Sequence, residues 1–277
     1  IMENYNIDKN RIYIVGGSMG GATGAIYANN HLNPTKPMVA ATASASGILD
    51  CERRAIEMDG NNSMIEWFGG EWYEVPFEYH RNSAVYFADS TQSMHYNLLH
   101  TPLYLDFGAS EPHRTHAEDL YALLQGYNLN MWIDTEPSGG HGYPVIDEND
   151  ACNWLSQFTL VDDPIYVNAN LDEPSRAYWF EALNQTNEDE FIRLVAGRDS
   201  LGIFIDEFQN SDSLLVYLPD EFINGFSFYI GEDEPFTIGF TAEELEHATG
   251  VTLYYFEEPT FGANLQDNTI WIEVVGW

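Results

Sequence analysis

Lysine is nearly absent from this sequence, which has only Lys9 and Lys36 among its 277 residues. Ten Lys and Arg side chains stand against 44 Asp and Glu, giving a formal net charge of −34 at pH 7. That charge repels phosphate backbones and anionic lipid surfaces, so we expect neither nucleic-acid nor membrane-surface binding. The acidic residues are spread along the chain among aromatics, which is typical of a solvated shell and not of a disordered tail. The composition fits a high-salt habitat or a secreted acidic enzyme, and it favours a secreted or periplasmic location.

Cysteines and long apolar runs are also scarce. Cys51 and Cys152 have neither CxxC spacing nor a nearby histidine pair, so we expect no zinc site, and the two form either one disulfide or two inert buried thiols. No stretch reaches the ~18 unbroken apolar residues that a membrane span needs.

The carboxylate clusters at 147–150 and 232–234 lack the glycine and distal glutamate of a calcium loop, and the first more simply caps the helix after it. The sequence therefore predicts no metal and no cofactor.

The first part of the chain, residues 1–160, alternates short apolar runs with helical segments. This alternation predicts a parallel sheet with helices on its faces. A long insert rich in Trp, Phe and Tyr, residues 50–100, separates the second and third strands. The expected strands are Ile12–Val15, Met38–Ala45, Leu103–Phe107 and Asn130–Thr135, and the expected helices are 18–32, 115–126 and 147–158.

The second part, residues 161–277, is dominated by short alternating strands. It predicts a small antiparallel β-sandwich or barrel with one helical piece at 241–249. The expected strands are Ile165–Asn170, Arg176–Leu183, Leu201–Asp206, Ser213–Leu218, Phe226–Ile230, Val251–Phe256 and Thr269–Val275.

The stretch Gly16-Gly-Ser-Met-Gly20 fits the pattern G-x-S-x-G, directly after an apolar strand and before a helix of small residues. A nucleophile that leaves a strand on so sharp a turn adopts strained dihedral angles, and glycines two residues before and after it remove clashes with the strand and helix. The turn also puts Ser18 at a helix N-terminus, where the Met19 N–H is free to hold a developing oxyanion. We therefore expect Ser18 to be a nucleophile.

Among the eight histidines, His141 has the surroundings expected of a catalytic base. It lies in a glycine-rich loop directly after the strand Asn130–Thr135, which brings it to the sheet edge where Ser18 lies. His113 and His116 are near the loop that should carry the acid and are candidates to line the site. The other histidines are expected on the surface or in packing: His31, His80, His95, His100 and His247.

The expected acid follows the strand Leu103–Phe107. Glu111 stands where a carboxylate could reach Nδ1 of His141, fix its tautomer and stabilise the imidazolium. Asp106 is the alternative acid, but it lies inside the apolar strand, where an ionised carboxylate is costly unless it is paired.

The order of these segments resembles the catalytic domain of prolyl-oligopeptidase-like hydrolases. The resemblance rests on Phe68–Ser83, with its Gly-Gly, Pro, Tyr and Ser, on Thr101-Pro-Leu-Tyr-Leu-Asp-Phe-Gly108, and on the Gly-Gly-His-Gly around His141, and it covers about residues 5–158. It implies an α/β-hydrolase domain with Ser18, Glu111 and His141 as its triad. The chain differs from the family's usual pattern in having Glu111 in place of Asp, followed by Pro112-His113-Arg114. The trailing β region resembles an extension found behind some bacterial members.

The resemblance also implies several strands before the nucleophile strand, and a loop among them that supplies the second oxyanion donor. We therefore expect the chain to be the later part of a longer hydrolase, with an upstream segment or another chain completing the sheet beside Ile12–Val15. A bare apolar edge of this kind would otherwise invite association.

These observations predict a serine hydrolase that cleaves an ester or amide bond of a small-molecule or peptide substrate through an acyl-enzyme. Esters are mildly favoured, because the aromatic insert could shape an apolar pocket. Candidate pocket residues are Gly17, Trp67, Trp72 and Tyr73, although ordinary packing explains the aromatic ones equally well. The alternative is a non-catalytic binding or scaffold module whose β region grips a polymer or partner through exposed aromatics such as Tyr178, Tyr254, Tyr255 and Trp271.

Overall fold

The computed structural model describes residues 4–59, 62–127, 130–136, 139–141, 146–200, 202–218, 226–230, 236–241, 251–254, 263–266 and 269–274. The chain divides into two compact units, Ile1–Asp162 and Asp163–Trp277. The first is an α/β unit built on a parallel sheet and the second is an all-β unit, which confirms the fold class predicted from the sequence. Within the described residues, no helix has both the length and the apolar character needed to cross a bilayer.

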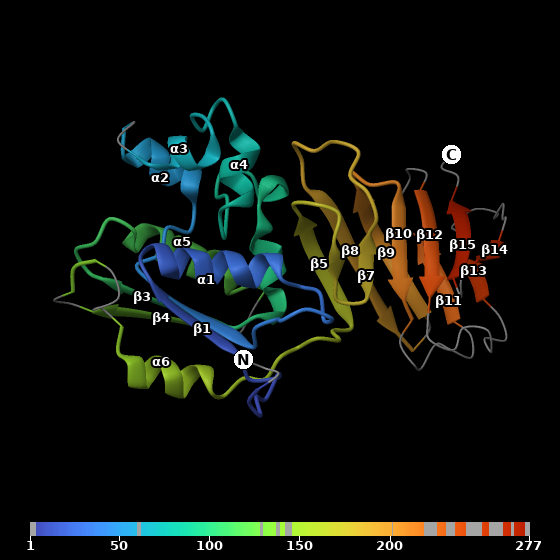
Figure 1. Ribbon diagram of the computed structural model, residues 1–277, viewed down its shortest axis with the longest axis horizontal. Helices are drawn as coiled ribbons and strands as arrows, with labels where there is room; N and C mark the ends of the chain where they lie inside the picture. Colours follow the sequence, from blue (N-terminus) through green and yellow to red (C-terminus); the bar gives the residue numbers. More distant parts are fainter. Residues whose placement is uncertain are drawn as a thin grey trace. The chain divides into compact units, whose positions relative to one another are not determined.

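The first unit contains a four-stranded sheet in the order β1-β2-β3-β4, with every neighbouring pair parallel. Helices α1 and α5 cover one face of this sheet and α6 covers the other (Figure 1). The elements are β1 Tyr13–Gly17, α1 Met19–Asn30, β2 Ala41–Ala45, α2 Cys51–Glu57, α3 Met64–Phe68, α4 Pro76–Arg81, the 3₁₀ helices η1 Ser90–Gln92 and η2 Met94–His100, β3 Leu103–Gly108, α5 Arg114–Leu124, β4 Met131–Glu136 and α6 Glu148–Leu155.

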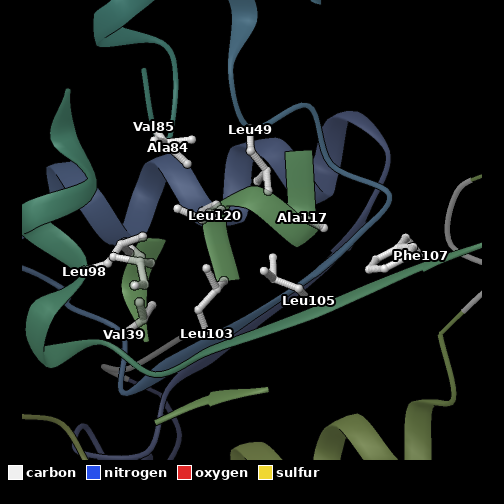
Figure 2. Close-up of a cluster of buried hydrophobic side chains, with 13 residues drawn as sticks. Val39, Leu49, Ala84, Val85, Leu98, Leu103, Leu105, Phe107, Ala117 and Leu120 are labelled. Atoms are coloured by element: carbon white, nitrogen blue, oxygen red, sulfur yellow. The ribbon is translucent and has the colours of Figure 1, made fainter. Parts of the chain in front are cut away.

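The period-2 alternation of β3 builds a core on both faces of the sheet. Leu103, Leu105 and Phe107 face α1 and α5, where they join a buried cluster with Leu120 (Figure 2). Tyr104 points to the opposite face and packs against Trp154 of α6, with ring centroids 5.5 Å apart. Because all six residues of β3 are buried, the carboxyl end of this strand is a rigid platform for the loop that carries Glu111.

The aromatic insert folds into three short helices, α2 to α4, and the two 3₁₀ helices. Cys51 is a free, buried thiol packed in a cluster with Tyr79, while Cys152 is free and exposed. The disulfide alternative is therefore wrong, and so is the expected burial of Cys152, which lies on the solvent side of α6. Asp147 caps α6 as expected, since its carboxylate accepts hydrogen bonds from the N–H groups of Asn149 and Asp150.

The second unit contains two sheets, with strand orders β14-β15-β12-β10-β7-β6 and β13-β11-β9-β8-β5. The edge-to-face contact of Phe228 with Phe240, at 4.9 Å between centroids, joins a strand of one sheet to a strand of the other. The unit is therefore a sandwich with its core between the sheets. Its strands are β5 Tyr166–Leu171, β6 Arg176–Ala177, β7 Phe180–Ala182, β8 Ile192–Asp199, β9 Gly202–Gln209, β10 Ser213–Tyr217, β11 Phe226–Ile230, β12 Phe236–Thr241, β13 Val251–Tyr254, β14 Ala263–Gln266 and β15 Thr269–Val274.

The sheets of this sandwich are mixed, whereas the sequence indicated an antiparallel arrangement. Three neighbouring pairs run parallel: β9 with β11, β11 with β13, and β10 with β12. From β9 to β13 successive strands alternate between the two sheets. Two neighbouring strands of one sheet are therefore separated in the chain by a strand of the other sheet, and they run in the same direction. Ile203, Phe228 and Leu253 consequently lie side by side although they are 25 positions apart along the chain.

Three strands were not expected from the sequence, namely β8, β12 and β14, and β12 includes Thr241, the first residue of the expected helical piece 241–249. The rest of that piece lies outside the described residues, as do Glu232–Glu234, His247 and Tyr255. Tyr178 is buried, with only 3% of its surface exposed, so it belongs to the core and not to a binding face. Tyr254 and Trp271 lie on β13 and β15.

Candidate active site

Ser18 occupies the turn between β1 and α1 in a backbone conformation that is rare for a residue with a side chain. Its φ of 55° and ψ of −121° put it at positive φ, which costs about 1–3 kcal/mol. The turn is held from both sides: the Ser18 N–H donates to the Ala45 carbonyl of β2 at 2.7 Å, and the Ser18 carbonyl accepts from the N–H groups of Gly21 and Ala22. The strained serine is thus fixed at the carboxyl edge of the sheet.

Gly16, two residues before Ser18, is needed for steric reasons, but Gly20, two residues after it, is not. A Cβ atom at Gly16 would lie 2.2 Å from the Gly20 carbonyl oxygen, so no larger residue fits there. A Cβ atom at Gly20 would meet nothing within 4 Å, which corrects the expectation that both glycines remove clashes. Gly21 is the second tight position, since its Cβ would lie 2.9 Å from the Ala45 carbonyl oxygen.

The structure brings Ser18, His141 and Glu111 into one hydrogen-bonded line. Ser18 Oγ lies 2.8 Å from His141 Nε2, and His141 Nδ1 lies 2.9 Å from Glu111 Oε2. These residues come from three separate segments that follow β1, β3 and β4, whose parallel order makes their carboxyl ends meet at one edge. The carboxylate facing His141 belongs to Glu111, while Asp106 is buried earlier in β3.

The hydrogen bonds assign a donor and an acceptor role to the two ring nitrogens of His141. A carboxylate only accepts, so His141 Nδ1–H donates to Glu111 and the unprotonated Nε2 accepts from the Ser18 hydroxyl. The Glu111 side chain is fully buried, whereas that of His141 is 43% exposed. A buried carboxylate behind a half-exposed imidazole can stabilise an imidazolium, which a proton transfer from the serine would require.

Met19 supplies one backbone donor beside Ser18. As the first residue of α1, its N–H has no acceptor within the helix and lies at the positive end of the helix dipole. Its side chain points to solvent with 65% of its surface exposed. The arrangement gives Ser18 one neighbouring N–H that can stabilise a developing oxyanion.

The loop before His141 packs directly on the end of β3. A Cβ atom at Gly108 would lie 2.2 Å from the Gly140 carbonyl oxygen and 2.3 Å from that of Gly139. Ser110 Oγ also donates to the Gly139 carbonyl at 3.1 Å. The position of His141 therefore depends on the absence of a side chain at residue 108.

For the ester hydrolysis that the sequence predicts, we expect Gly108→Ala to lower kcat by about 10²-fold. The added methyl must push away the loop that carries His141, and a displacement of about 1 Å can have this cost. The measurement is steady-state hydrolysis of a p-nitrophenyl ester, with far-UV circular dichroism to establish folding. Gly126→Ala is the matched control, since a Cβ atom there would meet nothing within 4 Å. A folded Gly108→Ala variant with the kcat of the unmodified chain would contradict this account of the loop.

The sequence named His113 and His116, near the loop that carries Glu111, as candidates to line the site, and the structure shows one of them, His113, in contact with His141. The rings of His113 and His141 meet edge to face, with centroids 5.1 Å apart, and His116 is wholly buried next to His113. Burial is the main cause that lowers the pKa of His113 to about 4, assisted by Arg54, His116 and His141. Burial likewise lowers the pKa of His116 to about 4, against the opposing effect of Glu57. Both imidazoles are therefore neutral near pH 7.

These two pKa values predict a loss of stability in mild acid. In the unfolded chain a histidine takes up its proton near pH 6.5, whereas in the folded chain His113 and His116 do so only near pH 4. Protons thus bind preferentially to the unfolded state between these values, and the free energy of unfolding falls as the pH decreases from 6.5 to 4. Urea unfolding across this range should show a shallower pH dependence for His113→Phe, and an unchanged slope in that variant would contradict the assignment.

The expected pocket residues lie in two different settings. Gly17 is the last residue of β1, directly before Ser18. Trp72 packs against the buried cluster of Cys51 and Tyr79, whereas the surfaces of Trp67 and Tyr73 are 60% and 64% exposed. The described contacts of the three aromatic residues lie within the insert, so their part in substrate binding stays a prediction.

No protein-family model matches the chain, and no curated protein matches it either. Among solved structures, the chain is similar to the fluorophosphonate-binding serine hydrolase F of Staphylococcus aureus, with 17% identity, a TM-score of 0.36, and coverage of 56% of this chain and 58% of that one. The chain is also similar to the S-formylglutathione hydrolase of S. aureus, with 18% identity, a TM-score of 0.41, and coverage of 56% of this chain and 58% of that one. An esterase of Pyrococcus furiosus shows 14% identity and a TM-score of 0.32, with coverage of 55% of each chain. The chain thus spans little more than half the length of these solved proteins.

Proposed function

We propose that this protein is a serine hydrolase that cleaves an ester or amide bond through an acyl-enzyme. The observation that carries the proposal is the line from Ser18 Oγ through His141 to Glu111, with distances of 2.8 and 2.9 Å. A strained serine at a helix N-terminus, a histidine of defined tautomer and a buried carboxylate are the parts that nucleophilic acyl transfer needs.

The steps follow from this geometry. His141 Nε2 takes the proton of Ser18 as Oγ attacks the substrate carbonyl, and Glu111 stabilises the resulting imidazolium. The Met19 N–H donates to the oxyanion of the tetrahedral intermediate. His141 then passes its proton to the leaving group, and the acyl group remains on Ser18. A water molecule that gives a proton to His141 attacks the acyl carbon, the bond to Ser18 Oγ breaks to release the acid, and His141 returns the proton to Oγ.

We favour small esters over peptides as substrates. An alkoxide or phenolate leaves more readily than an amine, so an ester demands less of a site in which the described residues provide one oxyanion donor, the N–H of Met19. The prolyl-oligopeptidase-like pattern at Phe68–Ser83 and Thr101–Gly108 supports a peptidase as the finer alternative. A series of p-nitrophenyl acyl esters, tested beside a blocked prolyl p-nitroanilide, separates the two: we expect turnover of the short esters, and selective turnover of the anilide would favour the peptidase.

The edge strand β1 suits a further strand from an upstream segment or another chain. Among the described strands it pairs only with β2, and Val15 on it is 37% exposed. An open apolar edge promotes association, which a net charge of −34 opposes at low ionic strength and permits once salt screens it. We expect sedimentation velocity to show self-association of the 277-residue chain in molar NaCl but not at 10 mM. A monomer at both salt concentrations would show that this edge is covered.

A further inference from the structure

The two hydrogen bonds of His141 leave one motion of its ring weakly restrained. They act at opposite nitrogens of the imidazole, toward Ser18 and Glu111. Hydrogen bonds in this arrangement fix where the ring lies but resist poorly a rotation about the line that joins them. The side chain is 43% exposed and follows Gly139 and Gly140, so a contact with the face or edge of the ring can set its tilt.

His113 makes that contact. Its ring lies edge to face with His141, at 5.1 Å between centroids and an interplanar angle of 66°. Only 5% of the His113 surface is exposed, and its Nδ1 is buried without a hydrogen-bond partner in the part of the chain that the structure describes. Within the described residues the contact between His113 and His141 is a ring contact, and no hydrogen bond joins the two side chains, so His113 acts on its neighbour through shape.

His113 is itself firmly placed. It precedes α5, and its carbonyl accepts hydrogen bonds from the N–H groups of His116 and Ala117. Its ring also contacts that of His116, with centroids 5.9 Å apart. His116 is fully buried, and its Nδ1 accepts from the Asp50 N–H at 3.4 Å. The His113 ring is thus in contact with both His141 and a second ring, that of His116, which is anchored in the interior of the unit.

The charges around His113 keep it compatible with catalysis. Burial is the largest cause that lowers the pKa of His113. Arg54 of α2, His116 of α5 and His141 lower it further, and Glu57 of α2 raises it. A neutral His113 adds no positive charge beside His141. A protonated one at this distance would oppose formation of the His141 imidazolium.

We propose that His113 is a positioning residue, whose ring packs edge to face against His141 and holds the catalytic imidazole at the tilt that aligns Nε2 with the Ser18 hydroxyl. The proposal rests on the hydrolase function proposed above. It assigns no proton transfer to His113 and requires an aromatic ring at this position, not a histidine as such.

The test compares His113→Ala with His113→Phe. Removing the ring should lower kcat for a p-nitrophenyl ester by about 10- to 100-fold while KM stays nearly constant, and phenylalanine should restore kcat to within roughly threefold of the unmodified chain. The acid limb of the pH–rate profile should keep its position in His113→Phe. Equal kcat for all three proteins, or a Phe variant as slow as the Ala variant although folded, would overturn the proposal.

A readout that needs no turnover separates this proposal from the hydrolase function. The low-field proton NMR signal of the His141 Nδ1–H, which is hydrogen-bonded to Glu111, reports the order of the ring directly. We expect this signal to be sharp in the unmodified chain and in His113→Phe, and broadened in His113→Ala. Retention of a sharp signal in His113→Ala would refute the positioning role even if the protein hydrolysed no ester, whereas broadening without any esterase activity would leave the role standing and count against the function.

Discussion

Replacement of Ser18 by alanine is expected to abolish ester hydrolysis and to leave the fold intact. Loss of the serine nucleophile in a triad lowers kcat by about 10⁶-fold, because the acyl-enzyme route disappears while substrate binding remains. The measurement is hydrolysis of p-nitrophenyl acetate by purified protein, corrected for the rate of the uncatalysed reaction. Circular dichroism should be unchanged, since the Ser18 hydroxyl contacts only His141 among the hydrogen bonds described for it.

Ser156→Ala provides a matched control for this variant. Ser156 is exposed at the end of α6, and its hydroxyl donates only to the nearby Asn153 carbonyl. Its replacement should leave kcat unchanged. If Ser18→Ala kept the activity of the unmodified chain after repeated purification, the triad assignment would be wrong.

Glu111→Gln is expected to have the second largest effect, a fall in kcat of about 10⁴-fold. The amide nitrogen of glutamine can donate to His141 Nδ1, which favours the wrong tautomer and leaves Nε2 protonated against the Ser18 hydroxyl. The glutamine side chain also removes the negative charge that stabilises the imidazolium. KM for the ester should change little, since Glu111 is buried behind His141.

Asp106→Asn separates the two candidate acids. Asp106 is buried on β3, so its replacement should act mainly on thermal stability and leave kcat within a few-fold. A large loss of kcat in Asp106→Asn together with a mild effect of Glu111→Gln would assign the acid to the strand.

The α/β part of the fold could be predicted from the sequence because the sequence patterns that indicate it are local. A β-branched run followed by a glycine turn and a helix of small residues predicts β1, the Ser18 turn and α1 without any knowledge of the rest. The placement of Glu111 and His141 required only that parallel strands end at the same edge. The structure brings these two side chains and Ser18 within hydrogen-bond distance, whereas their catalytic roles stay predictions.

The β unit was harder to predict because its pairing is not local. β8 shows no clean alternation, since Leu194, Val195 and Ala196 are all buried around a bulge. The parallel pairing of β9 with β11 depends on an intervening strand that lies in the other sheet, and no short-range pattern reports that. The contact of His113 with His141 also joins two loops 28 residues apart, so proximity to the acid loop was its only sequence signal.

The most direct test of the central claim is labelling by a fluorophosphonate, followed by mass spectrometry of the modified peptide. The reagent needs an activated serine and does not depend on the natural substrate. We expect one adduct per chain, located on Ser18, absent from Ser18→Ala and formed far more slowly in Glu111→Gln. A folded protein that takes up no label, or that carries it on another residue, would contradict the account of Ser18 as the nucleophile.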